Sequence, residues 1–269
     1  MKLIVQPGRP LHGTIKVPGD KSLSHRAVLF AALAEGESRI RNFLLSGVTR
    51  VMLNSLAALG VEWRINEDEL IIQGRGLRGF QAPPEGLNCG NSATTMRLLA
   101  GALAASGVPA TLDGSAGLRR RPMDRIVDPL ARMGVPIQAS EGGTAPLVML
   151  RREADQPLSA FNETLPVASA QVKSCLILAA LAADKETILR EPGPSRDHTE
   201  RMLRSMGVAV KTFAREEHGK TYYETHLLPP QGPLKPIDIT LPGDISAAAF
   251  LIIAGLISPG SELFLPGVG

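Results

Sequence analysis

Three groups of small polar and basic residues stand where the chain enters apolar runs of helical character. They are residues 21–26 (KSLSHR), 90–97 (GNSATTMR) and 168–173 (ASAQVK). The free backbone amides and the positive dipole end of a helix N-terminus favour an anion. These residue types therefore predict binding of a small ligand that carries several anionic groups.

Serine at a helix start also has a purely structural explanation, because its side chain can cap the first free amides. For one segment alone, capping with solvated basic neighbours is the simpler interpretation. Capping does not explain a cation one turn into each helix, at Arg26, Arg97 and Lys173, where the dipole disfavours positive charge unless an anion or an acid compensates. The recurrence favours one convergent anion site, provided that the three helix starts face the same way.

Two loops add further candidates for anion binding. Residues 119–121 are three arginines, and residues 194–200 read PSRDHTE. Arginine suits bidentate binding of carboxylate or phosphate. A solvated loop explains the arginine run equally well, and Asp197 or Thr199 can N-cap the following helix. Ser195 and Arg196 stay free to face a ligand.

Several classes of function find no support in the sequence. It contains no P-loop, dinucleotide fingerprint, zinc-protease motif or nucleophile elbow, and its five histidines lack metal-ligand spacing. We expect His25 to support the site rather than catalyse, and Cys89 and Cys175 to be packing residues. With 29 basic and 26 acidic side chains and 4% aromatic residues, the chain does not resemble a nucleic-acid-binding protein. Its longest apolar run, 247–257, is shorter than the ~20 residues of a membrane helix, and the two cysteines fit a reducing cytoplasm.

The elements that position these groups form an internal repeat. Four similar segments begin at Pro18, Cys89, Pro166 and Pro242, each with a break, small polar residues and an Ala/Leu run. We predict a unit of strand, helix, strand, second helix ended by glycine, and two-stranded ribbon. The first helices are apolar on every side and must be buried. The sequence thus predicts an α/β domain of three units, with the first helices inside and the sheets and second helices outside.

The fourth unit is incomplete. It supplies the apolar run 247–257 and the strand ELFL, and the chain then ends at Gly269 without a second helix or ribbon. One interpretation is a tail that caps the domain. We favour the other, the front part of a longer protein, because an apolar helix with no cover exposes a large patch.

Six segments together resemble the 5-enolpyruvylshikimate-3-phosphate (EPSP) synthase family, the 3-phosphoshikimate 1-carboxyvinyltransferases. They are PGDKSLSHRA, GNSATTMR, RRPM, ASAQVKS, PSRDHTE and PGDISAAAF, in the family's order and at roughly its spacing over essentially the whole chain. The resemblance implies an α/β (α+β) fold of repeated βαβαββ units around buried parallel helices, an inside-out α/β barrel. It implies a complete domain over 20–241, with 1–19 and 242–269 as parts of a second domain.

The same resemblance implies a transferase of the shikimate pathway, which leads to chorismate and the aromatic amino acids. Family members transfer the enolpyruvyl group of phosphoenolpyruvate to the 5-hydroxyl of shikimate 3-phosphate, release phosphate, and need no metal or organic cofactor. The wording of ASAQVKS and RDHTE resembles the glyphosate-insensitive second class. Because the methyl group of Ala93 stands where sensitive members have glycine, we expect glyphosate to be a weak competitor.

Matching of motifs implies a role for each candidate residue. Lys21 and Arg121 would bind phosphoenolpyruvate and stabilise charge in the transition state, with Gln171 and the helix start at Asn91, Ala93 and Thr94 close by. Shikimate 3-phosphate would be held by Ser22, Arg26, Ser169, Ser195 and Arg196.

The acid–base residue and further cations belong to the family's C-terminal half, so we expect this chain alone to be inactive and that half to be its partner. A second interpretation is a non-catalytic fragment that binds shikimate 3-phosphate or complements the other half. The related UDP-N-acetylglucosamine enolpyruvyl transferases are less similar, because they carry Lys-Asn where this chain has Lys21-Ser22.

Overall fold

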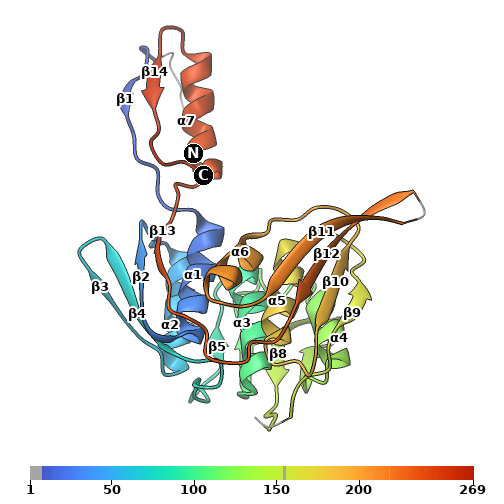
Figure 1. Ribbon diagram of the computed structural model, residues 1–269. Coiled ribbons are helices and arrows are strands. Elements are labelled where there is room, and N and C mark those ends of the chain that lie inside the picture. The colour runs from blue at the N-terminus through green and yellow to red at the C-terminus, as the bar shows by residue number, and fades with distance from the viewer. Residues whose placement is uncertain (1–7, 154–155, 218) are drawn as a thin grey trace.

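The computed structural model describes residues 8–153, 156–217 and 219–269. The first residues of the predicted segment 1–19 and His218 therefore lie outside the described residues. Within the described ranges the chain forms three four-stranded sheets and one separate two-stranded sheet (Figure 1).

Three consecutive units build the larger part of the molecule. The first contains α1 (Lys21–Leu33), β2 (Glu35–Arg41), α2 (Gly47–Ala58), β3 (Glu62–Asn66) and β4 (Glu69–Arg75). The second contains β5 (Leu87–Asn88), α3 (Ala93–Ser106), β6 (Ala110–Asp113), α4 (Asp124–Arg132), β7 (Ile137–Ser140) and β8 (Thr144–Met149). The third contains β9 (Asn162–Thr164), α5 (Ala170–Ala180), β10 (Thr187–Glu191), α6 (His198–Ser205), β11 (Val210–Glu217) and β12 (Lys220–Leu227). The predicted repeat of strands and helices is confirmed.

The first sheet is completed by a strand from the far end of the chain. In the other two units the leading strand lies parallel to the next strand, β5 beside β6 and β9 beside β10. In the first unit this place is taken by β13 (Asp238–Thr240), which lies parallel to β2 with Asp238 opposite Arg39. The three units are thereby joined into a ring between residues 20 and 241. This closure was not part of the sequence prediction.

The first helices of the units form the core, as predicted. Nearly all residues of α1, α3 and α5 after the first turn are buried. α3 and α5 cross so closely that a Cβ built on Gly101 would lie 2.3 Å from the carbonyl oxygen of Cys175. Only glycine permits this approach, which sets the spacing of the two helices.

The second helices end as the sequence predicts. Gly60, Gly134 and Gly207 follow α2, α4 and α6 with φ of 85°, 89° and 93°. Glycine adopts this left-handed conformation without a steric penalty, and the chain can turn at once into the outer ribbon.

A smaller group of elements extends away from the ring, at the top of Figure 1. Here β1 (His12–Thr14) pairs in parallel with β14 (Glu262–Phe264), beside α7 (Ile245–Ile257), in which only Ala248 is buried. Two crossing segments connect this group to the ring, since the Asp20 amide donates to the Pro242 carbonyl and the Asp244 amide to the Pro18 carbonyl, both at 2.9 Å. None of the helices in the described ranges has the length and apolarity to cross a membrane.

Candidate functional site

The N-terminal ends of α1, α3 and α5 lie together. Gln171 at the start of α5 donates from Nε2 to Oγ1 of Thr94 on α3, at 2.9 Å. Arg26 of α1 donates from Nη2 to the Ala170 carbonyl at 3.3 Å and to the Ser174 hydroxyl at 2.8 Å, both on α5. The predicted convergence of the three helix starts is confirmed.

The caps of these helices decide which hydroxyl groups are free. Ser92 and Ser169 accept hydrogen bonds from the Thr95 and Val172 amides, so the capping interpretation holds for them. α1 is capped by Asp20, which accepts from the Leu23 amide at 2.7 Å. Ser22 is therefore not the cap of its helix, and its half-buried hydroxyl is available to a ligand.

The residues expected to hold shikimate 3-phosphate meet at the starts of α1, α5 and α6. The exposed Arg196 lies in the loop before α6, and its Nη1 is 3.5 Å from the Ser22 hydroxyl. Ser195 beside it donates to Oε2 of Glu191 at 2.8 Å, and the Ser169 amide donates to Oε1 of the same carboxylate at 2.9 Å. Serine, arginine and free helix amides together are suited to an oxyanion such as phosphate.

Arg26 occupies a more interior position than the other members of this group. Only 3% of the residue is exposed. Besides its two bonds to α5, it donates from Nε to Thr199 and from Nη1 to the Ser22 carbonyl. These bonds leave one N–H, on Nη1, without a partner among the described residues. Burial lowers the pKa of Arg26 to about 10, so the side chain stays charged at neutral pH and adds positive potential at the helix ends.

The residues expected at phosphoenolpyruvate form a neighbouring group at the start of α3. Arg121 Nη2 lies 3.5 Å from Oδ1 of the exposed Asn91. Arg97 donates to Oε1 of Gln171 and, at 3.0 Å, to the Pro122 carbonyl. Arg97 thus links α5 to the arginine loop. Ala93 is buried at this helix start with 5% of the residue exposed, and Lys21 is exposed at the start of α1.

Within the arginine run, the side chains differ in their surroundings. Arg119 pairs with Asp113 through its guanidinium group, and the ion pair holds the pKa of that carboxyl below its usual value. Arg120 is exposed. Arg121 is therefore the arginine of the run that approaches the α3 start, as matching of motifs implied.

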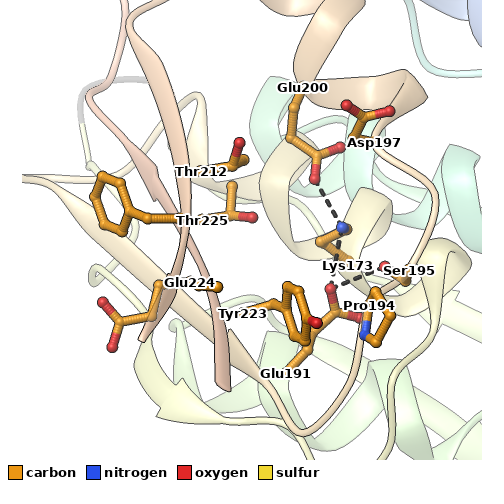
Figure 2. Close-up of a pocket in the computed structure, with 12 residues that line it drawn as sticks. Lys173, Glu191, Pro194, Ser195, Asp197, Glu200, Thr212, Tyr223, Glu224 and Thr225 are labelled. Atoms are coloured by element: carbon orange, nitrogen blue, oxygen red, sulfur yellow. Dashed lines mark hydrogen bonds and ion pairs between the residues drawn. The ribbon is translucent and has the colours of Figure 1, made fainter. Parts of the chain in front are cut away.

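Lys173 does not contribute a free cation to an anion site, contrary to the sequence interpretation. Its Nζ lies 3.0 Å from Oε2 of Glu191 and 2.7 Å from Oε1 of Glu200, and all three side chains are at least 95% buried (Figure 2). The compensating acid is the protein's own. Sequence reasoning missed Glu191, although a lysine one turn into a helix start signals that an acid must lie nearby.

The histidines and cysteines have supporting positions. Burial lowers the pKa of His25 and that of His198, so both rings are neutral at pH 7. His25 donates from Nδ1 to the Lys21 carbonyl at 2.8 Å. Cys89 and Cys175 are buried in the core, as expected of packing residues, and burial raises the pKa of each thiol to about 12.

Comparison with known proteins shows which family the chain is similar to. The model of the family described as EPSP synthase (3-phosphoshikimate 1-carboxyvinyltransferase) matches residues 5–269. The chain is 45% identical to the 3-phosphoshikimate 1-carboxyvinyltransferases of Syntrophomonas wolfei and Alkalilimnicola ehrlichii, and in both comparisons the whole chain is covered. It spans 60% and 58% of the length of these relatives.

A solved EPSP synthase from Acinetobacter baumannii superimposes with a TM-score of 0.86 at 41% identity, over 98% of this chain and 57% of the solved chain.

Proposed function

The chain belongs to the EPSP synthase family, and we propose that it provides the shikimate 3-phosphate side of an enolpyruvyl transferase. In this reaction C3 of phosphoenolpyruvate gains a proton while the 5-hydroxyl oxygen of shikimate 3-phosphate loses its own and forms a bond to C2. The tetrahedral intermediate then loses inorganic phosphate from C2 and a proton from C3, which restores the double bond in the enolpyruvyl product. The observation that carries the proposal is the meeting of three helix N-termini, with Ser22, Ser169, Ser195 and Arg196 at one place.

On the acceptor side, Arg196 and the three serines would hold shikimate 3-phosphate, and Arg26 would add positive charge from its buried position. The phosphate dianion needs donors and positive potential, and helix amides supply both. Arg26 also fixes the Ser22 carbonyl, so it supports the first turn of α1 as well as the ligand.

On the donor side, Lys21 and Arg121 would bind phosphoenolpyruvate, with Asn91, Thr94 and Gln171 nearby. Preorganised cations stabilise the negative charge that develops on the phosphate as it departs from the tetrahedral centre. The hydrogen bonds of Gln171 to Thr94 and Arg97 hold its amide in place before a substrate arrives. The methyl group of Ala93 takes up space at the N-terminal end of α3. This supports the proposal that glyphosate competes only weakly.

The chain spans about three fifths of its relatives' length, so we propose that the complete reaction needs the C-terminal part of the family's chain as partner. On this proposal the chain alone binds shikimate 3-phosphate without turnover. We place the enzyme in the cytoplasm, where the shikimate pathway supplies its substrate, and we propose no metal or organic cofactor.

Titration calorimetry of the chain with shikimate 3-phosphate tests the proposal, with shikimate as the matched control that lacks the phosphate. We expect a saturable heat with shikimate 3-phosphate and a far weaker one with shikimate. Equal binding of the two ligands, or no binding of either by a chain that circular dichroism shows to be folded, would contradict the proposal.

A further inference from the structure

A buried carboxylate, that of Glu191, lies directly behind two of the proposed substrate-binding serines. It stands at the end of β10, where the chain leaves the sheet for the loop that carries Ser195, and only 1% of the residue is exposed. Its Oε1 accepts the Ser169 amide and its Oε2 accepts the Ser195 hydroxyl. One carboxylate therefore joins the start of α5 to the loop before α6.

The charge of Glu191 is compensated within the fold. Lys173 lies between Glu191 and Glu200, so the ion pairs connect β10, α5 and α6 (Figure 2). A buried charge is tolerated only when it is paired and hydrogen-bonded, and here both carboxylate oxygens of Glu191 have partners. Its orientation is therefore fixed without a ligand.

The hydrogen bond from Ser195 also determines what that residue can offer. A hydroxyl group has one proton, and the proton of Ser195 points at Glu191 in this structure. In this state Ser195 presents its lone pairs to a ligand, and it donates to a phosphate only after releasing Glu191. Glu191 keeps its bonds to Lys173 and to the Ser169 amide during such an exchange.

We propose that Glu191 is a positioning residue for shikimate 3-phosphate: it sets the Ser169 backbone and the Ser195 loop at the spacing that the ligand needs. The inference rests on the proposed function, and it goes further by assigning a role to a residue that does not itself touch the substrate. Preorganisation of this kind raises affinity because the ligand does not have to order the groups that bind it.

Electrostatics alone and a positioning role predict opposite effects of a Glu191 substitution on the affinity for shikimate 3-phosphate, so a binding measurement distinguishes them. Glu191→Gln removes a negative charge near a bound dianion, and by Coulomb's law alone this tightens binding. A positioning role predicts weaker binding. In Glu191 one carboxylate oxygen accepts from the Ser169 N–H and the other from Lys173. The NH₂ group of a glutamine at this position would therefore face a donor in either orientation of the side-chain amide.

The matched control is Glu224→Gln. Glu191 and Glu224 line one pocket of about 280 Å³. Glu224 is 3% exposed, but its partners are Arg190, Arg215 and His226, and its carboxylate points away from Lys173 (Figure 2). This substitution removes one buried negative charge from a residue that lines the pocket, and it leaves both serines untouched.

The test combines calorimetry with amide hydrogen exchange measured by NMR. We expect Glu191→Gln to weaken shikimate 3-phosphate binding by about tenfold or more, which corresponds to the loss of one charge-assisted hydrogen bond. The Ser169 amide should exchange at least about tenfold faster. Glu224→Gln should reproduce the wild-type affinity and Ser169 exchange rate, even if its thermal midpoint falls.

Unchanged or tighter binding by folded Glu191→Gln, or unchanged exchange of the Ser169 amide, would overturn the inference. If that variant does not fold, Glu191→Asp serves instead, because it keeps the negative charge near Lys173 but moves the carboxylate oxygens away from Ser169 and Ser195. Wild-type affinity in this variant would also overturn the inference. If the wild-type chain does not bind shikimate 3-phosphate, the proposed function itself is contradicted. If the wild type binds and the variant binds equally well, only the positioning role of Glu191 is contradicted.

Discussion

At the scale of residues, equivalent positions in the repeat carry different functions. Arg26, Arg97 and Lys173 each stand one turn into a buried helix, but the structure uses them to hold other groups. Arg26 binds α5 and α6, Arg97 holds Gln171, and Lys173 is enclosed by two glutamates. The exposed cations left at the helix starts are those that begin a helix or lie in loops, such as Lys21, Arg121 and Arg196.

Arg196→Gln should weaken shikimate 3-phosphate binding without loss of stability. The side chain is exposed, so its removal creates no cavity, whereas a charge-assisted bond to phosphate is worth about tenfold to a hundredfold in affinity. Calorimetry and thermal unfolding of the same samples measure both effects. Arg201→Gln is the control, because Arg201 on α6 is also exposed but pairs with Asp197, the residue just before that helix. Equal losses in the two variants would show that only general charge matters.

The free energy of unfolding should fall as the pH drops below about 6.5, and His25 should contribute to this fall. Burial lowers the pKa of His25 in the folded chain from 6.5. The unfolded chain then binds more protons at mildly acidic pH, so acid favours unfolding. His25→Asn replaces the Nδ1 donor and removes the titration, and its stability should depend less on pH between 6.5 and 5. Urea unfolding at several pH values measures this, with His12→Asn, at an exposed site, as control. The same slope in His25→Asn and wild type would refute the assignment.

At the scale of elements, local sequence patterns predicted the helices and ribbons, but they did not predict which distant segments pair. The all-round apolar helices, the glycine stops and the ribbons follow from periodicity and turn residues, which act within a few positions. The closure of the first sheet by β13 joins Asp238 to Arg39, and no local pattern records a partner so distant. The enclosure of Lys173 by Glu191 and Glu200 was missed for the same reason, since three separate elements supply the charges.

Gly101→Ala should destabilise the chain by about 1–3 kcal/mol, the usual cost of overpacking a core. The added methyl group meets the Cys175 carbonyl and must push α3 and α5 apart. Because Gln171 and Thr94 lie at the ends of these helices, the hydrogen bond between them should also lengthen. Gly47→Ala is the control: Gly47 is also helical, has open space around it, and its substitution should change the free energy of unfolding by less than about 0.5 kcal/mol. Urea denaturation of both variants decides, and equal stabilities would contradict the close-packing account.

At the scale of the whole molecule, the ring and the smaller group differ in how they are buried. α1, α3 and α5 are enclosed by three sheets, whereas α7 leaves Phe250 and Leu256 each 79% exposed. The crossing segments at Asp20 and Asp244 bring the smaller group beside the start of α1, since the Lys21 amide donates to Asp244 Oδ2 at 3.3 Å. The proposed acceptor site therefore adjoins the segments that connect the two groups of elements, and the ring supplies its serines and arginines.

The most direct test of the central claim is a crystal structure of this chain with shikimate 3-phosphate bound. We expect the ligand at the N-terminal ends of α1 and α5, with its phosphate within hydrogen-bonding distance of Ser169 and Arg196. The Ser169 amide should still donate to Glu191. A ligand bound on another face, or one at the helix starts with its phosphate turned away from these residues, would contradict the account.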